Sequence, residues 1–468
     1  MESKTFRKHA HEFADWIADY FDTIEQYPVK SKINPGEIKS KIPQLPPEAG
    51  EPMASIFSDF QQIIIPGISH WQHPGWFAYF PANNSPASVL AEMLTAGLGV
   101  QGMIWDTSPA ATELEEVVMS WLGKMTGIPS EFSGVIQDTA STSTLCALVS
   151  AREKTTDYSI NQHGFHKILR VYASSQSHSS IEKGVKIAGF GKENLVYIET
   201  DENFALIPQL LESAIREDLK NGYIPCCVVA TLGTTSSMAM DPILETGKIC
   251  QQYGLWLHID AAFAGTAAIV PEYRDFMIGI EYADSFVFNP HKWMLTNFDC
   301  SAYFVKNPEI LQHTFSIMPE YLKTEADTQV NNYRDWGIQL GRRFRALKLW
   351  FVIRSYGVEG IREMVRRHVN LARLFADWIE KDGRFEILAP VKLSLVCFRY
   401  TTPNMNEKQL NDINKQLLKE INSSGDVYLT HTILNGKYCL RLSVGQRNTR
   451  ENHVKKVWDI IQKINFPG

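Results

Sequence analysis

The sequence lacks the features that would place it in a membrane or direct it to secretion. It contains no run of about 18 consecutive apolar residues, the length that a membrane-spanning helix needs. Residues 1–16, MESKTFRKHAHEFADW, also lack the apolar stretch of a signal peptide. We therefore expect a cytoplasmic protein with no membrane partner.

The chain has no excess of basic residues. It carries 46 lysines and arginines against 52 aspartates and glutamates, a net charge of −6 over 468 residues. Nucleic-acid-binding proteins usually show a basic surface, so this balance argues against a nucleic-acid partner. Hydrophobic residues make up 44% of the chain, as in an ordinary globular protein. The length suggests two or three domains, or one large domain with a smaller partner.

Cysteine is scarce and shows no motif. The seven cysteines are odd in number, include no CxxC pair and mostly lie in apolar stretches, so we expect buried, reduced thiols. The histidine pairs do not have the helical or knuckle spacing of a zinc site, and we expect no metal. These pairs are His9 and His11, His70 and His73, and His163 and His166.

The N-terminal part predicts a helix followed by an extended strap. Apolar residues at helical spacing over 10–27 predict an amphipathic helix. Residues 33–52 are rich in proline and have little capacity to form a core of their own. A helix joined by such a strap suits packing against another body, such as a second subunit.

From residue 134 onward, short apolar strands alternate with helix-like stretches. Strand–helix–strand repetition predicts an α/β fold with a mainly parallel seven-stranded sheet and helices on both faces. Right-handed crossovers bring the C-terminal ends of the strands to one edge, where ligands bind in such sheets. The predicted strands are 134–139, 167–174, 194–199, 226–233, 255–263, 285–289 and 301–306, and the helices between them are 142–155, 179–188, 208–221 and 242–253.

The last part of the chain predicts a smaller C-terminal α/β domain. A long helical region over 342–380 is followed by apolar strands near 386–400 and 438–445. We find no internal repeat and no low-complexity tract. The expected parts are an N-terminal helical segment at 1–85, a large domain at 86–360 and a small domain at 361–468.

Several predicted strands end on a polar group that could serve a ligand. Lys292 directly follows a short buried strand, although lysines are almost never fully buried unless paired. Asp260 and His178 end two further strands, and small hydroxyl residues open the helix after the first strand. Each group alone also has a plainer interpretation. Asp260, Thr139 or Ser141 could cap a helix, and a lone histidine is more often structural.

Together these groups are the parts that hold pyridoxal phosphate. A helix N-terminus suits the phosphate, a carboxylate can face the cationic ring nitrogen, and a histidine can stack on the ring. A lysine desolvated beside apolar walls has a lowered pKa, which makes its amine nucleophilic toward an aldehyde. Because all of these groups fall at one edge of one sheet, we favour the joint interpretation, with Lys292 as the Schiff-base lysine.

The sequence closely resembles the aromatic-L-amino-acid decarboxylases, which are group II pyridoxal-phosphate decarboxylases. The resemblance implies the aspartate-aminotransferase-like fold, PLP fold type I, and covers the chain from the opening helix to residue 449. Trp293 indicates the aromatic and histidine branch, because glutamate-type relatives have HKMMG around that position. The matching stretches are NPHKW, NFDCSAYFVK, HIDAAFAG, SQSHSSIEK, VVATLGTTS and LGRRFRALKLWFV.

The resemblance implies roles for individual residues. Lys292 would form the Schiff base, Asp260 would pair with the pyridinium nitrogen, and His178 would stack on the ring and meet the substrate. Tyr321, in a polar loop, matches the family tyrosine that returns a proton to Cα. The implied cofactor-binding residues are Ala140, Ser141, His178, Thr235, Asp260, Ala262, Asn289, His291 and Lys292. The implied substrate-binding residues are Trp71, Tyr79, Phe80, Pro81, Ala82, Gln101, Met103, His178 and Gly341.

The implied activity is decarboxylation of an aromatic L-amino acid to its amine and CO₂, by a homodimer with sites at the subunit interface. Tryptophan, tyrosine, phenylalanine and dihydroxyphenylalanine all remain possible substrates. An aldehyde synthase, a transaminase or a histidine decarboxylase on the same scaffold is the alternative, and a non-catalytic homologue is the third. Aldehyde synthases of this family carry Phe at the loop position or replace the histidine, so Tyr321 and His178 favour decarboxylation.

Two positions depart from the animal relatives. Gln101 and Met103 stand where those relatives have an aliphatic and an aromatic residue, at positions expected to line the pocket across the dimer. They weaken the preference for an aromatic substrate. Gly341 leans toward tryptophan, because plant members with Gly before the Arg pair tend to use indolic substrates and those with Ser phenolic ones.

Two basic features have structural interpretations, and one polar loop has a functional one. Arg441 resembles the carboxylate-binding arginine of aminotransferases, but an ion pair on the substrate carboxylate opposes its loss as CO₂, so a structural role is favoured. The run GRRFRALK over 341–348 is interpreted as an exposed basic helix face. The loop 318–335 lacks any core pattern, as expected for a lid.

Overall fold

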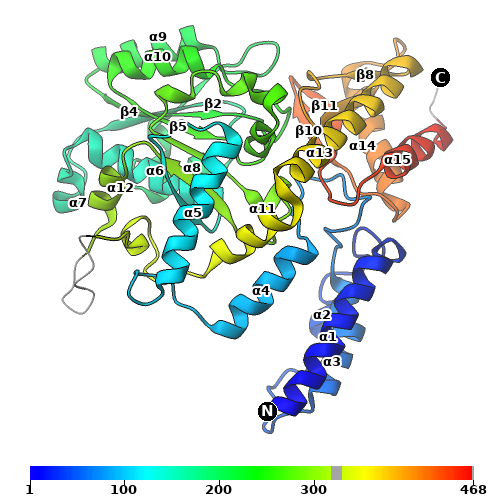
Figure 1. The fold of residues 1–468 in the computed structure, drawn as a ribbon. Coiled ribbons are helices and arrows are strands. Elements are labelled where there is room, and N and C mark those ends of the chain that lie inside the picture. The colour runs from blue at the N-terminus through cyan, green and yellow to red at the C-terminus, as the bar shows by residue number, and fades with distance from the viewer. Residues whose placement is uncertain (318–328, 466–468) are drawn as a thin grey trace.

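The computed structural model describes residues 1–317 and 329–465, whose strands form two sheets (Figure 1). The large sheet has the order β1-β7-β6-β5-β4-β2-β3, and the small sheet has the order β10-β11-β9-β8. The large sheet contains β1 Ser133–Gln137, β2 Leu169–Ser174, β3 Leu195–Ile198, β4 Ile224–Thr231, β5 Trp256–Asp260, β6 Ser285–Phe288 and β7 Ser301–Val305. The small sheet contains β8 Phe385–Ile387, β9 Leu395–Tyr400, β10 Thr430–Leu434 and β11 Lys437–Ser443.

The large sheet is mainly parallel, as the sequence predicts. Strands β2 to β6 pair in parallel, whereas β7 pairs antiparallel with both β1 and β6. Successive residues of a strand point to opposite faces. In β4, Val228 and Ala230 join one core cluster, and Cys227 and Val229 join the other.

Helices cover both faces of the large sheet, so both core clusters are closed off from solvent. The first face is covered by α5 Pro109–Thr126, α9 Pro208–Lys220 and α10 Ile243–Tyr253. The second face is covered by α6 Ala140–Thr155, α8 Ser180–Ile187 and α12 Pro308–Phe315, with the short helix α7 Ser159–His163 beside them. All seven cysteines are buried and free, as predicted.

The N-terminal helices extend away from the body of the molecule (Figure 1). Helix α1 Ser3–Thr23 begins and ends earlier than predicted, and it packs against α3 Met53–Asp59 through aromatic rings. The ring centroids of Phe13 and Phe57 lie 4.6 Å apart. The proline-rich strap contains only the short helix α2 Glu37–Lys41. Within the described part of the chain, no helix is long and apolar enough to cross a membrane.

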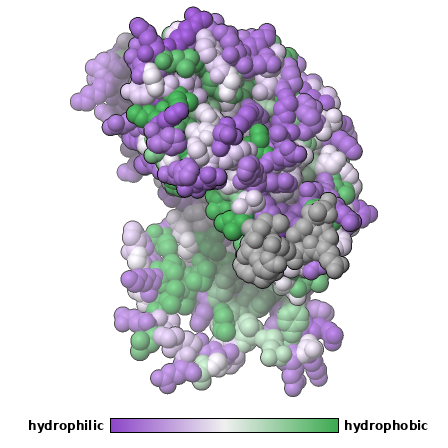
Figure 2. All heavy atoms as spheres, turned by 90° about the vertical axis from the view of Figure 1, so that its left-hand side faces the viewer, coloured by the Kyte–Doolittle hydropathy of each residue, from purple (hydrophilic) through white to green (hydrophobic). Residues whose placement is uncertain are grey.

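Helix α4 Pro86–Leu98 carries an exposed apolar face. Its Leu90, Leu94 and Leu98 side chains are 56%, 51% and 65% exposed. A groove of about 500 Å³ lies between α1 and the first part of α4, where Leu90 lines it. Figure 2 shows hydrophobic side chains gathered in the lower part of the molecule, where these N-terminal helices lie. An apolar face of this kind is typical of an interaction surface.

The C-terminal part forms a third core around the small sheet. Helix α13 Arg345–Asp382 bends at Gly357, whose φ is 66°, and then packs on this sheet with α14 Glu407–Ser423 and α15 Glu451–Lys463. Strand β10 was not predicted, because its residues are mostly polar and alternate between half-buried and exposed positions.

The prediction about the basic run 341–348 is wrong. The run 341–348 is not an exposed basic face, because Arg342 is only 8% exposed and Lys348 is fully buried. Each has an acidic partner that the local sequence does not reveal. The loop 318–335 was predicted to lack a core pattern, but at its described end Tyr333 and Arg334 are buried. Residues 318–328 lie outside the described residues, so the lid stays a prediction.

Candidate active site

A cavity of about 260 Å³ opens at the C-terminal edge of the large sheet. All nine residues that the resemblance implies for the cofactor line it, although they come from five separate segments of the chain. Phe80 from the N-terminal part closes one side. The lining residues are Phe80, Thr139, Ala140, Ser141, His178, Ser180, Thr231, Gly233, Thr235, Asp260, Ala262, Phe263, Asn289, His291, Lys292 and Phe298.

Lys292 reaches the cavity because β6 ends abruptly. Pro290 begins the short helix α11 Pro290–Trp293, directly after the strand and Asn289. Burial lowers the pKa of the Lys292 amine, and the nearby Asp260 carboxylate opposes that shift. Its Nζ lies 5.7 Å from the centroid of the Phe80 ring. A lysine with a lowered pKa has the nucleophilic free amine that an aldehyde requires.

Asp260 ends β5 and is almost fully buried. Its Oδ1 accepts a hydrogen bond from the backbone N–H of Ala262 at 3.0 Å, so the plainer interpretation as a cap is correct for one oxygen. Within residues 1–317 and 329–465, Oδ2 has no hydrogen-bond partner. An almost fully buried carboxylate needs a partner, and a cationic ring nitrogen in the cavity would supply one.

His178 presents a single hydrogen-bond donor. The backbone N–H of Ser180 donates to its Nδ1 at 3.1 Å, and the Ser180 hydroxyl lies 2.8 Å from the same atom. Since an N–H can only donate, Nδ1 is an acceptor and the neutral ring carries its proton on Nε2. Burial lowers the pKa of His178, Asp260 opposes this shift, and Lys292 adds to it. The ring is therefore a neutral donor.

The N-terminus of α6 provides an anion site at the other end of the cavity. Thr139 caps this helix by accepting from the N–H of Thr142 at 3.4 Å, whereas the first N–H groups, at Ala140 and Ser141, have no partner within the helix. The amide oxygen of Asn289 and the hydroxyl of Thr231 are buried without partners in the described part of the chain. These unpaired polar atoms fit a cavity built for a polar cofactor.

Of the residues implied for the substrate, only Phe80 and His178 line this cavity. Trp71 and Tyr79 lie outside it, where both are exposed and lie near the buried ring of Trp76. The Trp71 and Trp76 rings stack with centroids 4.3 Å apart, and Trp71 and Tyr79 with centroids 5.8 Å apart. The carbonyl of Ala82 accepts from the Gln72 amide at 3.0 Å, and Pro81 packs against Gly445.

Gln101 and Gly341 contact each other, away from the cavity. The side-chain oxygen of Gln101 accepts from the backbone N–H of Arg342 at 2.6 Å. A Cβ at Gly341 would lie 3.1 Å from Nε2 of Gln101. The carbonyl of Met103 accepts from the N–H of Arg334 at 2.9 Å. None of these three positions lines the cavity.

The family tryptophan after the lysine is part of a ring stack. Phe80 and Phe263 stack at 4.1 Å, and Phe263 and Trp293 stack at 4.5 Å. Arg441 lies beside this stack, with Cζ 5.6 Å from the Phe80 centroid and Nη1 donating to the Thr430 hydroxyl at 2.9 Å. These contacts agree with a structural role for Arg441.

Sequence reasoning missed Phe263 and Phe298, which line the cavity between predicted site residues. Phe263 lies just beyond Asp260 and Ala262, so its position after a strand end was a usable signal. Phe298 had no such signal.

Tyr321 lies outside the described residues. Among the described residues, no group of three or more His, Cys, Asp or Glu side chains is placed to hold a metal ion.

A seven-stranded α/β fold with a lysine, a carboxylate and a helix N-terminus around one cavity defines a pyridoxal-phosphate enzyme of fold type I. Residues 35–401 match the family model of the pyridoxal-dependent decarboxylase conserved domain. The chain belongs to the pyridoxal-dependent decarboxylase family.

Three similar proteins show how far this likeness extends. Tyrosine decarboxylase 3 of Petroselinum crispum is 45% identical, over 99% of this chain and 92% of its own. Phenylacetaldehyde synthase of Arabidopsis thaliana is also 45% identical, over 99% of this chain and 96% of its own. The crystal structure of Oryza sativa TDC with PLP and tryptamine has a TM-score of 0.96 at 34% identity, covering 99% of this chain and 98% of that one. The predicted family, fold and cofactor are confirmed.

Proposed function

We propose that the protein decarboxylates an aromatic L-amino acid to the aromatic amine and CO₂. The observation that carries this proposal is that Lys292, with its lowered pKa, and Asp260, with one unpaired oxygen, line the same cavity. The family membership supports the reaction type, and relatives named for tyrosine and tryptophan decarboxylation support the substrate class.

Each site residue has a definite task in this proposal. Lys292 holds the cofactor aldehyde through Nζ, and Oδ2 of Asp260 keeps a proton on the ring nitrogen. The bound cofactor supplies a cationic ring that accepts the electron pair left when the bond from Cα to the carboxylate breaks. Nε2 of His178 donates a hydrogen bond that orients the substrate carboxylate. Tyr321, by resemblance, supplies the proton that Cα needs after CO₂ leaves.

Three further parts of the hypothesis stay proposals. We propose a homodimer, because the exposed leucines of α4 form an apolar face that a second copy would cover. In that dimer, Gln101, Met103 and Gly341 would line the partner's substrate pocket, together with the aromatic group at Trp71 and Tyr79. We also propose a cytoplasmic location and the division into parts at 1–85, 86–360 and 361–468.

Aldehyde synthesis is the second candidate function. A tyrosine decarboxylase and a phenylacetaldehyde synthase share the same 45% identity with this chain, so overall similarity does not separate the two activities. The family pattern favours decarboxylation. Tyr321 and His178 are both present, and the resemblance associates this pair with decarboxylation.

Product analysis tests the proposal directly. Purified protein with pyridoxal phosphate is incubated with single aromatic amino acids, and CO₂, amine, aldehyde and peroxide are measured. We expect equal amounts of CO₂ and amine. Aldehyde and peroxide as the main products would contradict decarboxylation.

A separate assay tests the cofactor assignment. Lys292→Ala should lose the reducible visible absorption band, whereas the exposed control Lys455→Ala should keep it. A band that survives in Lys292→Ala would contradict the assignment of Lys292.

A further inference from the structure

Asn83 joins three segments of the chain through one buried side chain. Its amide nitrogen Nδ2 donates to the backbone carbonyl of Lys292 at 2.6 Å and to that of Gly445 at 2.7 Å. Its amide oxygen Oδ1 accepts from the backbone N–H of Arg447 at 3.0 Å. Asn83 is only 1% exposed, so solvent cannot replace these partners.

The three partners determine which way the amide points. An amide NH₂ group has two donors, and the two carbonyls use both of them. Turning the amide over would place its oxygen against the two carbonyl oxygens and its NH₂ group against the N–H of Arg447. All three hydrogen bonds would then be lost, so only the observed orientation satisfies these buried groups.

Asn83 also holds the C-terminal end of α11 through its backbone. The backbone N–H of Asn83 donates to the carbonyl of His291 at 3.0 Å. Helix α11 has only four residues, so its last carbonyls find no partners within the helix. The N–H of Lys292 donates to the carbonyl of Asn289 at 2.9 Å. Both backbone polar groups of Lys292 are therefore held in place.

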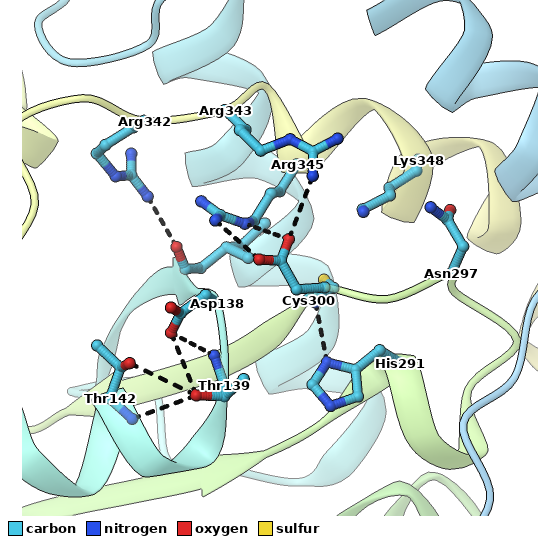
Figure 3. Close-up of polar contacts among 12 residues, drawn as sticks. Asp138, Thr139, Thr142, His291, Asn297, Cys300, Arg342, Arg343, Arg345 and Lys348 are labelled. Atoms are coloured by element: carbon cyan, nitrogen blue, oxygen red, sulfur yellow. Dashed lines mark hydrogen bonds and ion pairs between the residues drawn. The ribbon is translucent and has the colours of Figure 1, made fainter. Parts of the chain in front are cut away.

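A second set of contacts holds α11 through the His291 side chain (Figure 3). The backbone N–H of Cys300 donates to Nδ1 of His291 at 2.9 Å. Arg345 in turn donates to both oxygens of Asp299, the residue before Cys300, at 3.0 and 3.2 Å. These contacts do not reach the Lys292 carbonyl. Within residues 1–317 and 329–465, that carbonyl is held by Asn83 alone.

The contact with Gly445 links α11 to the small sheet, because Gly445 lies in the loop after β11. A Cβ at Gly445 would lie 2.6 Å from Cγ of Pro81, so a larger residue would collide with the segment that carries Asn83. The side-chain amide of Gln446 also donates to the carbonyl of Ala82 at 3.1 Å. The two segments are thus fixed to each other on both sides of Asn83.

We propose that Asn83 is a positioning residue that holds Lys292 in the orientation from which its amine reaches the cofactor aldehyde. Asn83 does not line the cavity, so it acts through Lys292. A helix as short as α11 has little stability of its own. Fixing both backbone groups of Lys292 fixes the direction of its Cα–Cβ bond, which aims Nζ into the cavity. The role rests on the proposed function, because it requires Lys292 to be the cofactor lysine.

The rate at which Lys292 bonds to the cofactor tests this role. Asn83→Ala removes the side-chain hydrogen bonds and keeps the backbone one. Apoenzyme is mixed with pyridoxal phosphate, and the appearance of the visible absorption band is followed with time. We expect the rate in Asn83→Ala to fall about tenfold or more, because a small misplacement of a reacting group is costly. Asn83→Ser, whose hydroxyl can donate one hydrogen bond, should give an intermediate rate.

Pyridoxamine phosphate separates positioning from general damage to the cavity. It carries an amine where pyridoxal phosphate has the aldehyde, so it binds without a bond to Lys292. Titration of the apoenzyme, followed by protein fluorescence, should give an affinity in Asn83→Ala within about twofold of the wild type. An affinity for pyridoxamine phosphate that falls as much as the rate would mean a damaged cavity, and would overturn the positioning role.

Asn414→Ala is a matched control. Asn414 is also fully buried, and Nδ2 donates to the carbonyls of Tyr400 and Leu410 at 2.9 and 2.7 Å, while Oδ1 accepts from the Tyr400 N–H at 2.7 Å. None of these residues lines the cavity. Urea unfolding should show similar losses of stability in Asn414→Ala and Asn83→Ala, whereas the visible band should form slowly only in Asn83→Ala. An equally slow band in Asn414→Ala would mean that lost stability alone explains the effect.

The outcomes separate this inference from the proposed function. A wild-type rate in Asn83→Ala would overturn the positioning role and leave Lys292 as the cofactor lysine. Where Asn83→Ala does not fold, a wild-type rate in Asn83→Ser has the same meaning. Absence of the band in the wild-type enzyme would instead overturn the proposed function, and the role of Asn83 with it.

Discussion

Nζ of Lys348 lies 3.1 Å from Oε2 of Glu92, and the Lys348 side chain is fully buried. Burial lowers the pKa of Lys348 to about 8. A buried charge needs a compensating partner, because it has lost its hydration. This ion pair therefore ties α13, which leads into the small sheet, to the exposed helix α4.

Glu92→Gln should destabilise the protein by about 2 kcal/mol, since it takes the carboxylate at 3.1 Å away from the fully buried ammonium of Lys348. Urea unfolding measures this change in the free energy of unfolding. Asp459→Asn breaks the exposed pair with Lys455 and should cost less than about 1 kcal/mol. A loss for Glu92→Gln no larger than for this control would show that the pair contributes little.

Asp260→Asn should bind the cofactor but lower kcat by about 100-fold or more, a size typical of lost electrostatic stabilisation at a reacting centre. The amide can still accept from the Ala262 N–H, so the turn after β5 should survive. It cannot hold a proton on the ring nitrogen as a carboxylate does. Steady-state kinetics of the cofactor-saturated enzyme measure kcat. A kcat of Asp260→Asn equal to that of the wild type would refute this expectation.

The sequence predicts the large sheet and its ligand edge because both depend on local patterns. Alternating strands and helices determine the parallel sheet, and the strand ends carry Lys292, Asp260 and His178 to one edge. The position of each of these residues directly after an apolar strand is therefore enough to group them.

The acidic partners of the basic run 341–348 could not be predicted in this way. Lys348 and Arg342 pair with Glu92 and Glu115, which lie more than two hundred residues earlier in the chain, so no local pattern reveals the partners. An isolated basic run looks like a solvated face until the fold brings the carboxylates to it. Phe298 could not be predicted either, because it lines the cavity from a loop whose sequence has no periodic pattern.

Gly341→Ser should raise kcat/KM for tyrosine relative to tryptophan, by about tenfold if the new side chain alters a substrate pocket. The added Cβ would lie 3.1 Å from Nε2 of Gln101, so the amide must move. Competition assays with both amino acids measure the ratio. The same substitution in a Gln101→Ala background relieves that contact. An identical shift in both backgrounds would mean that Gln101 has no part in the selectivity.

The protein should lose stability as the pH falls from about 6.5 toward 4, because buried histidines stay neutral in the fold. Burial lowers the pKa of His258 to about 4 and of His368 to about 3. In this window the unfolded chain binds protons that the folded chain excludes, so acid favours unfolding. Above the unfolded pKa this stability is fully present.

Urea unfolding at pH 5 and pH 7 measures the pH dependence of the unfolding free energy. His368→Gln should reduce this pH dependence, because one proton-binding group of the unfolded chain is gone. The amide can still accept from Nε1 of Trp293, which now donates to Nδ1 of His368 at 2.9 Å. His163→Gln, at an exposed position, should leave the pH dependence as it is. The comparison uses the change in unfolding free energy between pH 5 and pH 7. A packing defect in His368→Gln lowers the unfolding free energy at both pH values and therefore does not produce the expected change. An unchanged slope would show that His368 takes no part in the acid response.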